Sequence, residues 1–203
     1  EMNDEELIPD QVQTLCTGLE KILPSYDLVI VVDYGHGMIG RSVVDLLCRM
    51  ARFLSVNTQA NAGNRGFNTI SKYHRADYVC IAQHEIALEE RNQREEIREM
   101  ILNVSRKLNC GRVMVTRSKD GTLYYDQEKG FAEGPAFSQQ PVDTMGAGDA
   151  VLSLTSLFVA NGAPPDIVAF VGNVVGAEAV STVAHRRSTE AGPLMRQIES
   201  LLK

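Results

Sequence analysis

The sequence lacks the features that mark membrane, disulfide-stabilised and nucleic-acid-binding proteins. None of its apolar runs reaches the ~20 residues that a membrane-spanning helix needs. Its four cysteines lie far apart, form no C-x-x-C pair and have apolar neighbours, so we expect reduced thiols in a protein core. The net charge is −6 and the basic residues are scattered, which excludes the clustered positive charge that binds nucleic acid.

Other absences narrow the class further. The four histidines have no metal-ligand spacing. No G-x-G-x-x-G with a later acidic residue follows the early strands, so a Rossmann dehydrogenase is the weakest alternative. No positively charged start precedes an apolar segment, as a secretory signal requires, and together with the reduced thiols this predicts a cytoplasmic protein. With 203 residues, 44% of them hydrophobic, and no repeat or linker, we expect one globular domain over residues 1–203.

The most informative segment that is present is D-T-M-G-A-G-D at residues 143–149, followed by an apolar helix predicted over residues 150–160. Gly146, Ala147 and Gly148 carry almost no side chain, so a phosphate can approach their N–H groups where a helix dipole favours negative charge. Asp149 would then face an acceptor hydroxyl and take its proton during attack on a nucleotide phosphate. The alternative is an ordinary helix start, in which an acidic residue caps free N–H groups.

The longer run resembles the signature of the ribokinase-like (PfkB) carbohydrate kinases. T-R-S-x-x-G at residues 116–121 is similar to the turn that presents a nucleotide-binding threonine in the heptose-phosphate kinase branch of the ADP-heptose pathway. A strand ending in D-Y-x-x-G at residues 33–37 is also similar to that branch, although His36 stands where lysine is usual. Complete members open with a strand-rich region that carries a Gly-Gly motif and a β lid. No such region is seen here, so the resemblance is to the C-terminal part of such a kinase.

The resemblance implies an ATP-dependent kinase that transfers the γ-phosphate to a hydroxyl of a sugar or sugar phosphate, with Mg²⁺ bridging the nucleotide phosphates. Asp149 is then the catalytic base, and the amides of Gly146, Ala147 and Gly148 form the anion hole. The other implied roles are nucleotide binding by Thr116, Ser118, Gly121 and Asn173, action on the metal through water by Glu85, and sugar contact by Asp33. The small residues around Asn173 equally fit a helix that simply packs closely against its neighbour.

Departures from the family pattern keep a second interpretation open. Ala82 stands where the family has the asparagine of an N-x-x-E element that organises Mg²⁺, Leu154 stands where a small residue is expected, and residues 57–59 replace a D-P-K-like strand end. The alternative is therefore a catalytically impaired nucleotide-binding or scaffold domain of a larger protein. The partners expected are a nucleotide and a sugar or sugar phosphate, without nucleic acid or membrane, and either a homo-oligomer or an additional N-terminal segment completes the sugar pocket.

The apolar periodicities predict an α/β fold with a mostly parallel sheet flanked by helices. Short, continuous apolar runs predict buried strands at residues 28–32, 53–56, 78–81 and 113–115, and three- and four-residue spacing predicts helices at 41–51 and 93–108. Residues 121–132 read as an antiparallel hairpin at one edge, and helices are predicted at 166–183 and 193–202. Ligands of such sheets bind beyond the carboxyl ends of the strands, so we expect Asp33, Asn57, Glu85 and Thr116 on one rim.

Overall fold

The computed structural model describes residues 6–61, 63–64, 66–92, 95–137, 146–181 and 190–201. In these residues, six strands form one sheet in the order β1-β2-β3-β4-β5-β6. The first four strands are parallel, and β5 and β6 continue the sheet as an antiparallel hairpin. The strands are β1 (Val29–Asp33), β2 (Leu54–Thr58), β3 (Tyr78–Ala82), β4 (Arg112–Thr116), β5 (Thr122–Asp126) and β6 (Gly130–Gly134).

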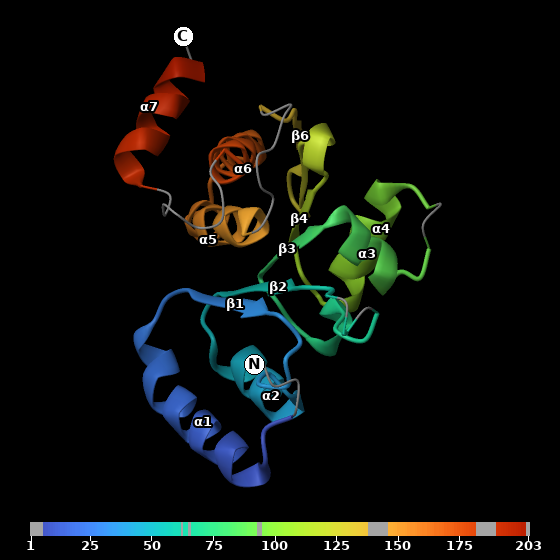
Figure 1. Cartoon of the computed structure of the whole chain (residues 1–203), viewed down its shortest axis with the longest axis vertical. Helices are drawn as coiled ribbons and strands as arrows, with labels where there is room; N and C mark the ends of the chain where they lie inside the picture. The colour runs from blue at the N-terminus through green and yellow to red at the C-terminus, as the bar shows by residue number, and fades with distance from the viewer. Residues whose placement is uncertain are drawn as a thin grey trace.

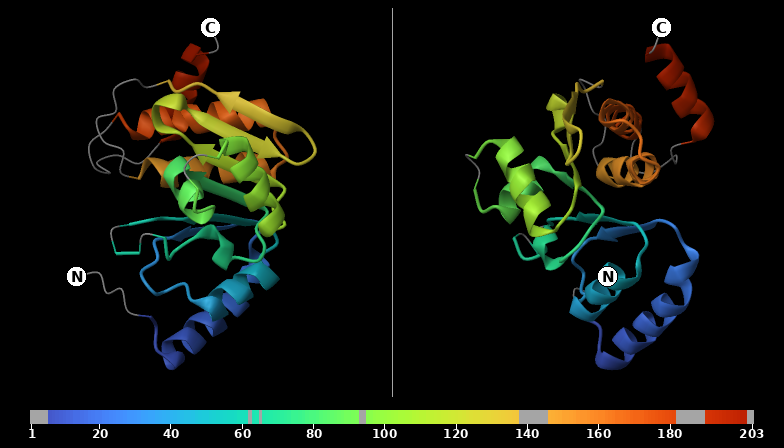
Figure 2. Two further views of the ribbon diagram at one scale, coloured as in Figure 1. Left: turned by 90° about the vertical axis from the view of Figure 1, so that its right-hand side faces the viewer. Right: turned by 180° about the vertical axis from the view of Figure 1, so that it is seen from behind.

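Helices cover both faces of this sheet. The α-helices are α1 (Pro9–Ile22), α2 (Arg41–Met50), α3 (Gln83–Glu89), α4 (Ile97–Lys107), α5 (Ala147–Ala160), α6 (Pro165–Ala179) and α7 (Ala191–Leu201), and the 3₁₀ turns are η1 (Leu23–Ser25), η2 (Ile70–Lys72) and η3 (Ser118–Asp120). Figure 1 shows the sheet nearly edge-on, with α5 and α6 on one side and α2, α3 and α4 on the other. Two further views show the same three layers, with α7 outside α6 and α1 beside α2 (Figure 2). No helix within these described segments is long and apolar enough to cross a membrane.

The alternation of side chains along the strands divides the core in two. In β3, Val79 and Ile81 pack with α2, α3 and α4, whereas Tyr78 and Cys80 point to α5 and α6. Each of these side chains is at most 1% exposed. Because both faces of the central strands are buried, their sequences read as unbroken apolar runs.

The predicted fold class, the four parallel strands and the edge hairpin are confirmed. Several helix boundaries were wrong. Helix α5 begins at Ala147, three residues before the predicted start, and Gly146 is its N-cap in the left-handed conformation (φ 74°). Helix α4 begins at Ile97, where the Glu96 side chain accepts a hydrogen bond from the backbone N–H of Arg98, and α6 ends at Ala179.

The register of the parallel strands brings their carboxyl ends to one edge of the sheet. Asp33 lies opposite Thr58 at the ends of β1 and β2, and Ala82 lies opposite Thr116 at the ends of β3 and β4. Asn57 differs from its prediction, since it lies inside β2, is 4% exposed and donates to the backbone oxygen of Cys80 over 2.7 Å. The carboxyl ends of four strands therefore lie along one edge of the sheet, with polar side chains at Asp33, Thr58 and Thr116, whereas the Asn57 side chain bonds within the sheet.

Candidate active site

Helix α5 places the predicted anion hole and base in its first turn. Gly146 is the N-cap, and Ala147, Gly148 and Asp149 follow it inside the helix. The first N–H groups of a helix have no partner within it, so they remain available to an anion. Asp143, Thr144 and Met145 of the same motif lie outside the described residues.

A cavity of about 1000 Å³ opens between α5 and the carboxyl ends of β3 and β4. It is large enough for a nucleotide, since ligand pockets commonly measure ~300–1,000 Å³. Its lining includes Thr116, Ser118, Gly121, Asn173, Ala147 and Gly148. The structure thus brings together six residues that the sequence assigned to nucleotide or phosphate binding, from three separate segments.

The turn between β4 and β5 forms one wall of this cavity and depends on its glycine. Gly121 has φ 75°, and a Cβ atom there would lie 2.0 Å from the backbone oxygen of Gly134. Ser118 also has a positive φ of 52°, which is uncommon outside glycine. This tight turn places Arg117, Ser118 and Gly121 in the wall of the cavity.

Asn173 has a structural role in this fold. Its Nδ2 donates to the Thr122 hydroxyl over 3.0 Å and to the backbone oxygen of Ala169 over 2.9 Å, and the residue is only 5% exposed. The side chain therefore links α6 to β5 at the cavity wall. Its predicted contact with a nucleotide stays a prediction.

The Asp149 carboxylate is not part of the lining of this cavity and contacts the segments that follow β1 and β2. Its Oδ2 accepts a hydrogen bond from the Tyr34 hydroxyl over 2.7 Å, and its Oδ1 accepts one from Gln59 Nε2 over 2.6 Å. Sequence reasoning missed both partners, because they lie far away along the chain. The signal that could have found them is position, since each follows the carboxyl end of a strand.

Asp33 ends β1 but is enclosed. It is 2% exposed, and its carboxylate accepts hydrogen bonds from the Tyr73 hydroxyl (2.8 Å) and the Gly35 N–H (3.0 Å) and pairs with Lys72. These contacts fix the loop that carries Tyr34. The predicted contact of Asp33 with a sugar stays a prediction, and Tyr34 is the more exposed of the two neighbours, at 43%.

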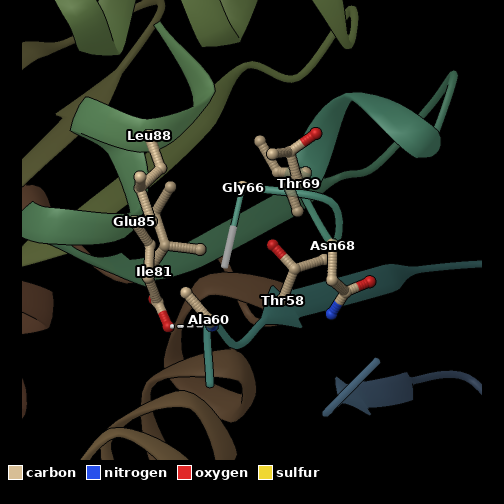
Figure 3. Close-up of a pocket in the computed structure, with 9 residues that line it drawn as sticks. Thr58, Ala60, Gly66, Asn68, Thr69, Ile81, Glu85 and Leu88 are labelled. Atoms are coloured by element: carbon tan, nitrogen blue, oxygen red, sulfur yellow. Dashed lines mark hydrogen bonds between the residues drawn. The ribbon is translucent and has the colours of Figure 1, made fainter. Parts of the chain in front are cut away.

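Glu85 lies in the first turn of α3, with a side chain that is 10% exposed. It accepts hydrogen bonds from the N–H groups of Ala82 (2.7 Å) and Ala60 (3.2 Å), and thereby joins β3 to the loop after β2. Figure 3 shows the bond to Ala60. Burial raises the pKa of Glu85, with a smaller rise from nearby Asp149, while the two N–H groups and His84 oppose it. The cavity beside it is only about 10 Å³, the size of one water molecule, so it is no ligand pocket.

Comparison with known proteins decides the family. A model described as pfkB family carbohydrate kinase matches residues 43–191, which is more than half of the chain. The chain belongs to the pfkB family of carbohydrate kinases.

Relatives of this pfkB-family chain include longer proteins. The bifunctional protein HldE of Desulfatibacillum aliphaticivorans is 24% identical over 185 residues, which cover 88% of this chain and 37% of that protein. An uncharacterized sugar kinase of Buchnera aphidicola subsp. Schizaphis graminum is 28% identical over 160 residues, which cover 76% of this chain and 49% of that protein. The chain therefore spans less than half the length of these relatives.

Solved structures show the same fold. Phosphofructokinase-2 from Escherichia coli aligns with a TM-score of 0.79 at 14% identity, over 98% of this chain and 64% of that one. Ribokinase from Thermotoga maritima aligns with a TM-score of 0.69 at 17% identity, over 90% and 58% of the two chains. The pfkB-family chain thus has the ribokinase-like architecture that its sequence predicted.

Proposed function

We propose that this chain is the nucleotide-binding and catalytic part of an ATP-dependent sugar kinase, with a heptose phosphate as the favoured acceptor class. The observation that carries the proposal is the position of Asp149, in the first turn of a helix whose first residues line a nucleotide-sized cavity. The T-R-S-x-x-G and D-Y-x-x-G segments and the similarity to proteins named HldE support the heptose branch.

In the proposed reaction Asp149 accepts the proton of an acceptor hydroxyl. The hydroxyl oxygen forms a bond to the γ-phosphorus as the bond to the β–γ bridging oxygen breaks and ADP leaves. The N–H groups of Ala147 and Gly148, fixed before the reaction by the helix, stabilise the negative charge that develops on the phosphoryl oxygens. Thr116, Ser118 and Gly121 border the space that we assign to the nucleotide.

We propose Mg²⁺ as the metal, with Glu85 acting through water, because both of its carboxylate oxygens already accept backbone N–H groups. Glu85 supplies a carboxylate, the ligand type that this cation prefers, and the described residues hold no cluster of three or more side chains that would form an all-protein metal cage. That donor set suits an ion bound mainly by nucleotide phosphates and water. When bound, Mg²⁺ would neutralise charge on the phosphates, and Glu85 would orient one of its water ligands.

The test is calorimetric titration of ATP with and without Mg²⁺, followed by a transfer assay over heptose, hexose and pentose phosphates. Asp149→Asn should bind ATP normally and lose transfer by about a hundredfold or more, because a general base contributes at least that much. The matched control is Asp166→Asn, since Asp166 occupies the first turn of α6 and is exposed. That variant should transfer phosphate like the wild type.

A folded wild-type chain that binds no ATP, or binds ATP without transfer to any acceptor, would contradict the kinase proposal. The first result would favour a scaffold and the second an impaired nucleotide-binding domain. A preference for another sugar phosphate would contradict only the heptose assignment.

A further inference from the structure

The carboxylate of Asp149 is held from two sides by residues that the mechanism above does not use. The Tyr34 hydroxyl donates to one oxygen and the Gln59 amide to the other, at 2.7 and 2.6 Å. Tyr34 comes from the loop after β1 and Gln59 from the segment after β2. Both lie at the edge of the sheet where an acceptor has to approach Asp149.

The loop that carries Tyr34 is held in place by the asparagine-rich segment after β2. The backbone oxygen of Tyr34 accepts hydrogen bonds from the side-chain amides of Asn61 (3.0 Å) and Asn64 (2.7 Å). Gly35 has φ 73°, and a Cβ atom there would lie 2.2 Å from Asn64 Nδ2. The backbone under Tyr34 is therefore fixed by several independent contacts, which aim its side chain at Asp149.

Tyr34 and Gln59 differ in how easily each can move away from the Asp149 carboxylate. Tyr34 is 43% exposed and its ring stacks only against His36 (centroids 6.2 Å apart) among the described aromatic pairs, so little of the fold opposes its displacement. Gln59 is half-buried. Its backbone N–H donates to the backbone oxygen of Asp33 over 2.8 Å, which continues the β1–β2 hydrogen bonding by one residue. Burial, together with Asp149, raises the pKa of Tyr34 to about 12, so the phenol keeps its proton and acts as a donor.

We propose that the Tyr34 hydroxyl occupies the place on Asp149 that the acceptor hydroxyl takes, and that Gln59 keeps the carboxylate oriented when the acceptor displaces Tyr34. Phenol and sugar hydroxyls are both neutral O–H donors to a carboxylate, so they compete for the same oxygen. An occupied base cannot activate water, which protects ATP until an acceptor arrives. This inference rests on the proposed kinase function and adds two positioning residues to it.

Tyr34→Phe removes only the competing hydroxyl. It should lower the KM for the acceptor by about tenfold, because the acceptor hydroxyl no longer has to break the charge-assisted hydrogen bond between Tyr34 and Asp149. The kcat should stay near the wild-type value, and ATP hydrolysis without acceptor should rise. Gln59→Leu should instead lower kcat by about a hundredfold with little change in KM, because it misaligns the base. Tyr26→Phe is the matched control, since Tyr26 is 57% exposed and lies before β1, and it should leave both parameters unchanged.

A second readout does not depend on turnover. With ¹³Cζ-labelled tyrosine, the NMR signal that disappears in Tyr34→Phe belongs to Tyr34, and it should shift both in Asp149→Asn and when a transferable acceptor is added. If wild type transfers phosphate but Tyr34→Phe keeps the wild-type KM and hydrolysis rate, the competition is overturned and the kinase function stands. If wild type transfers to no acceptor, the kinase function fails and this inference fails with it.

Discussion

At the scale of single residues, Glu85 shows how burial and hydrogen bonding act on one carboxylate in opposite directions. Its side chain is 10% exposed, and burial is the largest cause that raises its pKa above 4.5. The N–H groups of Ala82 and Ala60 favour the charged form, but they do not cancel the cost of burial. The folded protein therefore binds a proton at Glu85 more tightly than the unfolded chain does.

This raised pKa predicts how Glu85 affects stability as pH changes. Its favourable contribution is fully present below pH 4.5, and it is lost as pH rises through the higher pKa of the folded state. Glu85→Gln removes that titration, so the free energy of unfolding of wild type should fall relative to the variant as pH rises above 4.5 and through the raised pKa of the folded state. Urea unfolding of both proteins at several pH values gives the difference between their free energies of unfolding. The contributions of the other titrating groups cancel in this difference. A difference that does not change with pH would contradict the prediction.

The sequence was informative at the residue scale wherever neighbours along the chain determine the geometry. The first turn of α5 was predicted because small residues next to an acid define a helix start within a few positions. The contacts of Tyr34 and Gln59 with Asp149 were missed, since they join residues 115 and 90 positions apart and only the order of the strands brings them together. Asp33 also has partners, among them Tyr73, that only the folded chain brings together.

At the scale of elements, α6 is attached to the hairpin through Asn173. Asn173→Ala would leave the Thr122 hydroxyl without this partner in the interior, so the free energy of unfolding should fall by about 1–3 kcal/mol. Asn161→Ala is the control, because Asn161 also donates to a backbone oxygen four residues earlier but is exposed, and its cost should be within about 0.5 kcal/mol. Urea unfolding compares the two. Equal losses in the two variants would show that the buried bond from Asn173 to Thr122 adds no stability beyond a bond to a backbone oxygen four residues earlier.

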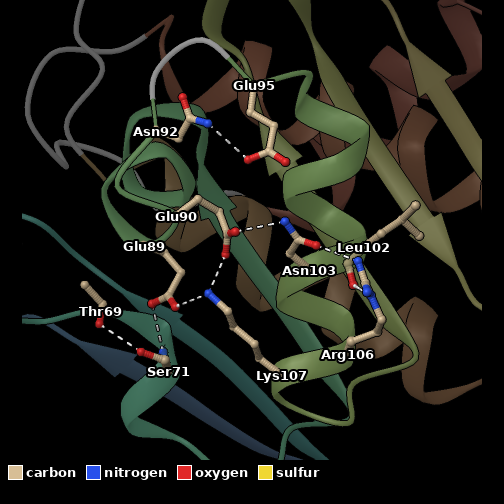
Figure 4. A network of polar contacts seen from close by, with 10 residues as sticks. All are labelled: Thr69, Ser71, Glu89, Glu90, Asn92, Glu95, Leu102, Asn103, Arg106 and Lys107. Atoms are coloured by element: carbon tan, nitrogen blue, oxygen red, sulfur yellow. Dashed lines mark hydrogen bonds and ion pairs between the residues drawn. The ribbon is translucent and has the colours of Figure 1, made fainter.

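A second link between elements joins α3 to α4 through Lys107 (Figure 4). Its ammonium contacts Glu89 (3.4 Å) and Glu90 (2.7 Å), whose side chains are 4% and 7% exposed. Hydrogen bonding to Glu90 raises the pKa of Lys107, so its stabilising effect is present below pH 10.5 and is lost as pH rises above that value.

Lys107→Met keeps most of the aliphatic stem and removes the charge. We expect a loss of about 1 kcal/mol at neutral pH, because Lys107 itself is 47% exposed and solvent weakens the pair. Lys107→Arg keeps the cation and should lose less, as measured by thermal unfolding at fixed pH. If both variants unfold like wild type, the two acidic side chains are stabilised by other groups, among them Asn103.

Helices and strands were predictable where their apolar residues recur at helical or strand spacing. The four parallel strands were predicted from apolar runs, and the hairpin from a turn between β-rich segments. Helix α1 was missed, although Pro9 at its start and Leu15 and Leu19 four residues apart are signals for it. None of its residues is fully buried, so its apolar face is narrow and the sequence pattern is weak.

At the scale of the whole molecule, the start of α5 relates stability to ligand binding, because the same helix dipole acts on side chains and on phosphate. No described atom lies within 4 Å of a Cβ built on Gly148, whose backbone is helical, so a side chain fits there. Gly148→Glu should raise the free energy of unfolding of the free protein by about 0.5–2 kcal/mol, since it removes a flexible glycine and adds an acid to a first helical turn.

The same substitution should abolish stabilisation by nucleotide. At a hundredfold excess of Mg·ATP over its Kd, wild type should gain about 2.7 kcal/mol, and Gly148→Glu should gain almost nothing because its carboxylate repels the phosphates. Gly148→Gln separates charge from size, and it should retain more of the gain than the glutamate variant. Thermal unfolding of the three proteins with and without Mg·ATP gives all the comparisons. If Gly148→Glu is more stable alone and is still fully stabilised by Mg·ATP, the phosphates of the bound nucleotide do not approach the start of α5, and the proposed anion hole is wrong.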